Sequence, residues 1–150
     1  MIDNSGQRTD RDVYVVHSEP LPCPAYLTWS VAGRFNDLTW LPGVSSFSWE
    51  GNIRRFSIGS AHFIERMESE SDVGRAYSYS LIDGPVPVRD YLASLRVEAA
   101  EGGCVFVMES RSRVAPEMVA EVEQMLKAAY SAAARALRKR VLSLVAAAKT

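Results

Sequence analysis

The amino-acid sequence predicts an α+β fold, in which a curved antiparallel sheet of about seven strands wraps one long C-terminal helix and encloses an internal cavity. Three features predict this fold. A β-branched run lies near the start of the chain, and six segments of period-two alternation follow between turn residues. The chain then closes with a helix-forming run that contains no glycine.

The length and composition are those of one domain that needs neither metal nor nucleic acid. A chain of 150 residues is long enough to bury a core of its own. The 17 Lys and Arg nearly balance the 18 Asp and Glu, so no basic footprint for nucleic acid is expected. The two cysteines and two histidines lie in no metal-binding spacing, and no dinucleotide or P-loop fingerprint occurs. We therefore expect no metal and no cofactor.

The first residues predict a tail rather than a targeting segment. Residues 1–11 are polar and charged and are expected to be flexible, which leaves residues 12–150 as the single domain. The tail lacks the apolar core of a signal peptide or anchor. We therefore expect a cytoplasmic protein without membrane insertion, a setting that suits two reduced thiols.

Turn residues and periodicity divide the domain into its elements. Residues 12–18 predict a strand, residues 24–34 a short helix, and residues 36–40 a second short helical turn. A meander of six strands is predicted next, over residues 44–50, 53–59, 62–69, 75–82, 90–99 and 104–113. Residues 116–150 predict one helix that is longer than the strands, so its basic end should overhang the sheet. Its expected buried stripe is Met118, Val122, Met125, Ala129, Ala133 and Ala136 or Leu137.

Short motifs in this order resemble a known superfamily. They are W-x-x-x-x-x-F from Trp29, L-x-x-W-x-P-x-V from Leu38, R-R-F from Arg54, E-R-M-E from Glu65, Y-S-Y-S-L-I-D-G-P from Tyr77 and R-D-Y from Arg89. The chain resembles the START-like or SRPBCC superfamily, in its polyketide cyclase/dehydratase-like branch, over residues 12–145. The resemblance implies the helix-grip fold. It leaves the function open, because the superfamily uses one cavity for binding, transport and catalysis.

The resemblance also implies which side chains face the cavity. Glu65 matches a carboxylate that faces the cavity in the abscisic acid receptors, and strand alternation extends the assignment to its neighbours. The expected catalytic residues are Glu65, Glu109 and Tyr91. The expected substrate-binding residues are Arg54, Phe56, Phe63, Met67, Tyr77, Tyr79, Leu81, Ala93, Val107 and Arg111 of the sheet, Val122 and Met125 of the long helix, and Trp40 and Leu41 near the mouth.

Two interpretations of the inward carboxylates stay open. Glu65 or Glu109 could pair with Arg54 or Arg111 as a structural bridge, since a buried charge needs a partner. Alternatively, one carboxylate has a raised pKa and acts as a general acid or base, while Tyr91 polarises a substrate carbonyl. Many bacterial relatives carry tryptophan at the position of Glu109, which makes this second carboxylate the sharper pointer to chemistry.

Departures from the hormone receptors narrow the expected function. Leu41 replaces the lysine that anchors the ligand carboxylate in the abscisic acid receptors, and the gate loop is reduced to residues 59–62. We therefore expect an enzyme of secondary metabolism that promotes cyclisation, dehydration or a related proton transfer on a hydrophobic oxygenated substrate. The alternatives are a carrier of a lipid, terpenoid or polyketide and an interaction module that uses the overhanging helix. The sequence leaves a homodimer open.

Overall fold

The computed structural model describes residues 9–149, arranged as one sheet and two α-helices. The predicted tail falls mostly outside the described residues. The elements follow in the order β1 (Arg11–Leu21), α1 (Ala25–Ala32), β2 (Val44–Glu50), β3 (Ile53–Ile58), β4 (Ala61–Ser71), β5 (Ala76–Asp83), β6 (Arg89–Ala100), β7 (Gly103–Val114), a 3-10 turn (Pro116–Met118) and α2 (Val119–Ala148).

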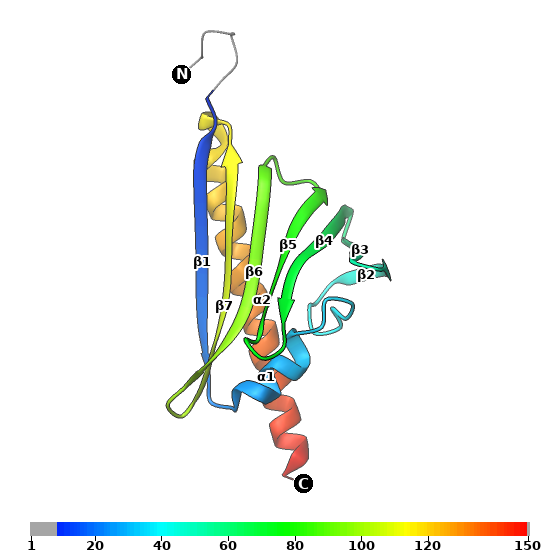
Figure 1. Cartoon of the computed structure of the whole chain (residues 1–150), viewed down its shortest axis with the longest axis vertical. Helices are drawn as coiled ribbons and strands as arrows, with labels where there is room; N and C mark the ends of the chain where they lie inside the picture. Colours follow the sequence, from blue (N-terminus) through cyan, green and yellow to red (C-terminus); the bar gives the residue numbers. More distant parts are fainter. Residues whose placement is uncertain (1–8, 150) are drawn as a thin grey trace.

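The sheet is a curved antiparallel meander that the first strand completes. Its order is β1-β7-β6-β5-β4-β3-β2, so β1 pairs with the last strand and β2 forms the opposite edge (Figure 1). From β2 to β7, each strand is joined to the next strand in the chain by a hairpin connection. Gly51 and Gly102 adopt positive φ values of 60° and 79° in two of these connections, a conformation that glycine reaches at little steric cost.

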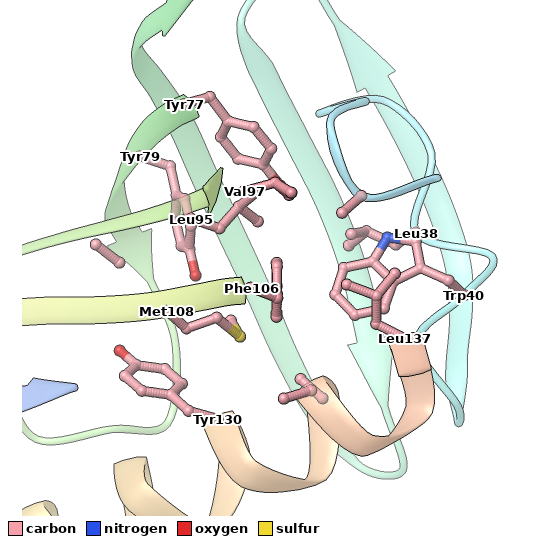
Figure 2. Close-up of a cluster of buried hydrophobic side chains, with 14 of the residues drawn as sticks. Leu38, Trp40, Tyr77, Tyr79, Leu95, Val97, Phe106, Met108, Tyr130 and Leu137 are labelled. Atoms are coloured by element: carbon pink, nitrogen blue, oxygen red, sulfur yellow. The ribbon is translucent and has the colours of Figure 1, made fainter. Parts of the chain in front are cut away.

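The long helix α2 packs on the concave face of the sheet. Its buried residues recur at helical spacing, which places them on one stripe. They are Val122, Leu126, Tyr130, Ala133, Ala134, Leu137 and Val141. The prediction is right at Val122, Ala133 and Leu137, but between Val122 and Ala133 the buried residues are Leu126 and Tyr130. Figure 2 shows the side chains of Tyr130 and Leu137 pointing from α2 into the cluster of buried side chains. The last turns of α2 extend past the strands, as the lengths predict (Figure 1).

Two sequence predictions are wrong in detail. The second short helix is absent, and residues 34–41 form turns closed by the bonds Asp37 N to Arg34 O (3.1 Å) and Leu41 N to Leu38 O (3.0 Å). Strand β1 starts at Arg11 and continues past Ser18 to Leu21. It tolerates Pro20 because an edge strand leaves one side of its backbone unpaired. No described helix is long and apolar enough to cross a membrane.

Candidate functional site

A cavity of about 400 Å³ lies between the concave face of the sheet and α2. We call it the main cavity. Its wall includes residues of the segment between α1 and β2, of the β5–β6 loop and of α2. The structure places eleven of the predicted residues in its wall: Trp40, Leu41, Arg54, Phe56, Phe63, Glu65, Tyr77, Tyr79, Leu81, Tyr91 and Met125.

Arg54 and Glu65 form a buried ion pair in this wall. They lie directly opposite each other on β3 and β4. The Arg54 Nε donates to Glu65 Oε1 at 2.8 Å, and Nη2 lies 2.7 Å from the same oxygen. The Nη1 group is engaged as well, because it donates to the Phe35 carbonyl oxygen at 2.9 Å and to the Tyr77 hydroxyl at 3.3 Å. The guanidinium also lies 4.2 Å from the centroid of the Phe35 ring, a cation–π distance.

The protonation of Glu65 reflects competition between burial and this ion pair. Removal from water disfavours the charged carboxylate and raises its pKa, while the charge and hydrogen bonds of Arg54 lower it. Burial is the larger effect, so the pKa of Glu65 lies above its ordinary value. A carboxylate tuned in this way is a better proton acceptor than one in water.

Four tyrosines line the main cavity beside the ion pair: Tyr77, Tyr79, Tyr91 and Tyr130. The hydroxyls of Tyr91 on β6 and Tyr130 on α2 are hydrogen-bonded to each other. Burial raises the pKa of Tyr79 and Tyr91 well above the ordinary value and also raises the pKa of Tyr130. These phenols therefore stay protonated at neutral pH and serve as hydrogen-bond donors.

Residues 13–142 match the family described as polyketide cyclase / dehydrase and lipid transport. The chain belongs to this family. The match runs from the third residue of β1 to the last third of α2, so it includes β2–β7 in full and every residue that lines the main cavity. Family and cavity together support a protein that binds a hydrophobic ligand.

Solved structures share the fold of this family member. Protein XoxI from Bacillus cereus is 25% identical over 88% of this chain and 97% of its own, with a TM-score of 0.79. Norcoclaurine synthase from Thalictrum flavum, solved with dopamine and hydroxybenzaldehyde, is 20% identical over 89% and 88%, with a TM-score of 0.73. Ara h 8.0201 is 16% identical over 89% and 99%, with a TM-score of 0.72. The predicted superfamily and helix-grip fold are thereby confirmed. A comparison with curated proteins finds no match.

Glu109, predicted to be catalytic, lies on the other face of the sheet in this polyketide cyclase / dehydrase family member. Its neighbours Met108 and Ser110 are the buried residues of β7 at this point. The Glu109 carboxylate accepts hydrogen bonds from Tyr14 on β1 and Arg96 on β6. The Tyr14 bond, followed by the Arg96 contacts, lowers the pKa of Glu109. The prediction was wrong by one residue of register, which moves every side chain of a strand to the opposite face.

Other predicted residues are also displaced from the main cavity. Arg111 and Val107 share the outward face of β7 with Glu109. Ala93 and Val122 are buried in the core without bordering the main cavity. Met67 points inward but borders a separate cleft, which also includes Trp29, Trp49, Glu70 and Asp72.

Several wall residues escaped the sequence analysis. They are Leu38, Pro42, Pro85, Val86, Met108, Leu126, Tyr130 and Ala132. Helical spacing from Val122 would have found Leu126 and Tyr130, which follow it at four-residue intervals. The same register error that brought Glu109 inward removed Met108 from the predicted wall.

The histidines and cysteines take no part in the main cavity. His62 is hydrogen-bonded through Nδ1 to Ser57 Oγ at 2.7 Å, and His17 through Nε2 to Glu19 at 2.9 Å. Cys23 and Cys104 are buried, and the sulfur of each lies within 3.4 Å of the Thr28 hydroxyl. No group of His, Cys, Asp and Glu within residues 9–149 could hold a metal ion.

Proposed function

We propose that this domain binds a neutral, hydrophobic, oxygen-bearing small molecule in the main cavity and acts on it as a cofactor-independent enzyme of the polyketide cyclase/dehydratase type. The observation that carries the proposal is the position of Glu65, a buried carboxylate with a raised pKa in the wall of an apolar cavity lined with protonated tyrosines. Each part of the wall has a separate role in this proposal.

The walls account for binding. The main cavity is within the size range of small-molecule sites, and its wall is mostly aliphatic and aromatic. Arg54 and Glu65 are the only charged residues that border it among those the structure describes, and they neutralise each other. A charged ligand would lose its hydration without gaining an unpaired counter-charge, so a neutral ligand is favoured.

The polar groups account for chemistry. Glu65 would accept a proton from carbon or oxygen of the bound substrate and become a neutral carboxylic acid, and Arg54 would hold the carboxylate in position before the transfer and again after the proton is returned. Within the Tyr91–Tyr130 pair, the hydroxyl that accepts keeps its own proton and would donate it to the oxygen on which negative charge develops. Holding a flexible substrate in one reactive conformer supplies a further part of the rate gain, so few catalytic groups are needed.

A carrier without catalytic activity is the second candidate. The observation that favours it is the engagement of Arg54, whose contacts with Glu65, Phe35 and Tyr77 give the ion pair a purely structural explanation. A carrier would keep Glu65 ionised and unreactive, and its ligand would leave the cavity unchanged.

The two candidates differ in an exchange experiment with an enolisable ketone. β-Tetralone in heavy water takes up deuterium next to its carbonyl when a base removes the proton, and proton NMR follows the loss of signal. The enzyme proposal expects the wild-type protein to accelerate this exchange and Glu65→Gln to abolish the acceleration while binding the ketone equally well. Glu68→Gln is the matched control, since Glu68 is an exposed carboxylate on the same strand paired with Arg66. Binding without any acceleration would favour the carrier.

A further inference from the structure

The indole nitrogen of Trp40 is a buried hydrogen-bond donor without a protein acceptor. Trp40 comes from the segment between α1 and β2, borders the main cavity and is only 6% exposed. Its ring packs edge-on against Phe106 at a centroid distance of 6.2 Å. No described residue accepts a hydrogen bond from Nε1.

Such a donor is unusual enough to need a reason. A buried indole N–H normally finds a partner, because leaving it unpaired forfeits the hydrogen bonds that it makes in water. Even the partly exposed Trp29 has such a partner, since its Nε1 donates to Asp72 Oδ1 at 3.1 Å. Phenylalanine would supply a similar packing surface at position 40 without burying a polar group. A ligand acceptor in the main cavity gives the N–H of Trp40 its partner.

A second donor lies elsewhere in the same wall. When Tyr91 and Tyr130 bond to each other, one hydroxyl donates and the other accepts, and the accepting hydroxyl keeps its own proton. That proton remains available to a ligand. Figure 2 shows the phenols of Tyr79 and Tyr130 on one side of Phe106 and the indole of Trp40 on the other. The main cavity therefore presents hydrogen-bond donors at two separated points.

The wall of the main cavity also contains a pair of stacked aromatic rings. The rings of Phe56 and Phe63 stack at 5.1 Å with an interplanar angle of 13°, and both border the main cavity. Aromatic side chains in a cavity wall favour a ligand with rings of its own, because ring pairs add to the apolar contact. An indole N–H donates but cannot accept, so the ligand atom opposite Trp40 must be an acceptor.

We propose that Trp40 Nε1 is a ligand-binding donor and that the main cavity takes a neutral polycyclic or aryl ketone whose carbonyl oxygen accepts a hydrogen bond from this indole. This inference rests on the proposed binding of a hydrophobic ligand and adds the class of ligand and the residue that selects it. The selection acts through the N–H group alone, so an isosteric ligand without the carbonyl oxygen gains nothing from it.

Fluorenone and fluorene test the inference, because they share one ring skeleton and differ in the carbonyl group. The chain has 3 tryptophans, so proton–nitrogen correlation spectra contain 3 indole signals, and Trp40→Phe identifies that of Trp40. We expect fluorenone to shift the Trp40 indole proton downfield and fluorene to leave it without a downfield shift. We also expect Trp40→Phe to weaken fluorenone binding about 2- to 10-fold, the range of one hydrogen bond, and to spare fluorene. Trp49→Phe, at a half-exposed position outside the main cavity, should change neither affinity.

Two results would overturn the inference in distinguishable ways. If both compounds bind and fluorenone neither shifts the Trp40 proton nor loses affinity in Trp40→Phe, the role of Trp40 is refuted while ligand binding in the main cavity stands. If neither compound binds, the proposed function fails for this ligand class and the inference fails with it. If Trp40→Phe does not fold, Trp29→Phe and Trp49→Phe identify the Trp40 signal by elimination, and titration of the wild-type protein still tests the inference.

Discussion

Arg54 holds Glu65 by a single carboxylate oxygen, since its Nε and Nη2 atoms lie 2.8 and 2.7 Å from Oε1. A fork-to-fork pair would engage both oxygens and fix the carboxylate completely. Here Oε2 receives neither of these contacts, and the Glu65 side chain keeps 10% of its surface accessible at the main cavity. One group can therefore be both half of a structural ion pair and a reactive carboxylate.

Arg54→Met should destabilise the protein strongly. The substitution leaves Glu65 buried without its counter-charge, and breaking a buried pair in this way typically costs about 3–5 kcal/mol. Urea denaturation at neutral pH measures the loss. The matched control is Arg66→Met. It removes the cation of an exposed ion pair between Arg66 and Glu68, which both lie on β4, and should cost less than about 1 kcal/mol.

The double variant Arg54→Met/Glu65→Leu separates charge from shape. Replacing both partners by apolar residues removes the unpaired charge, so it should recover most of the stability lost in Arg54→Met. A double variant as unstable as Arg54→Met would show that the guanidinium contributes mainly through Phe35 and Tyr77 and not through Glu65.

The stability difference between the wild type and Glu65→Gln should fall as the pH rises. The pKa of Glu65 in the folded protein lies above its ordinary value of 4.5, so between these two values the folded protein binds more protons than the unfolded chain. The contribution of Glu65 is therefore greatest below pH 4.5 and is lost as the pH rises through the folded pKa. Urea denaturation of both proteins from about pH 4 to about pH 8 tests the slope.

Glu68→Gln supplies the opposite slope as a control. Hydrogen bonds from Arg66 and Ser80 lower the pKa of Glu68, so its contribution is present above 4.5 and is lost as the pH falls. If the Glu65 difference curve rose with pH as the Glu68 curve does, the attraction of Arg54 would outweigh burial, and Glu65 would be a poor general base.

The faces of β4, β5 and β6 could be predicted from the sequence, but that of β7 was misjudged. Residues 104–108 are apolar without interruption, so alternation alone gives no frame for this strand. The pairing of β7 with β6 in their hairpin fixes which residues of β7 point inward. Alternation from Ala93, which is predicted to face inward, places Val97 on the same face, and a tight turn at residues 101–102 pairs Val97 with Phe106. Directly paired residues share a face, so Phe106, Met108 and Ser110 point inward and Glu109 points outward.

Two features of the main cavity depend on tertiary structure and leave no local pattern. The hydroxyl pair joins Tyr91 and Tyr130 across 39 residues, and no sequence period relates a strand residue to a helix residue at that separation. Whether the indole N–H of Trp40 has an acceptor depends on residues that are brought near it only in the folded chain, and no described residue accepts from it.

Glu109→Gln should leave ligand binding and any turnover in the main cavity unchanged. Its carboxylate lies on the outer face with Tyr14 and Arg96, on the far side of the sheet from the cavity wall. The ion pair with Arg96 is partly exposed, so its loss should cost less than about 1 kcal/mol in urea denaturation. A large loss of β-tetralone exchange in this variant would contradict the placement of β7.

Tyr130→Phe should weaken ligand binding and stability together, and Tyr91→Phe should do the same. Each substitution removes one hydroxyl of the bonded pair and leaves the other without its partner in a buried wall, at a cost of about 1–3 kcal/mol. The double variant should lose less than the sum of the single losses, because the pair's mutual hydrogen bond can be removed only once. Urea denaturation and fluorenone titration of the three variants measure both effects. Tyr26→Phe, at an exposed position on α1, is the control. Strictly additive losses would show that the two hydroxyls act independently and would remove the bonded pair from the site.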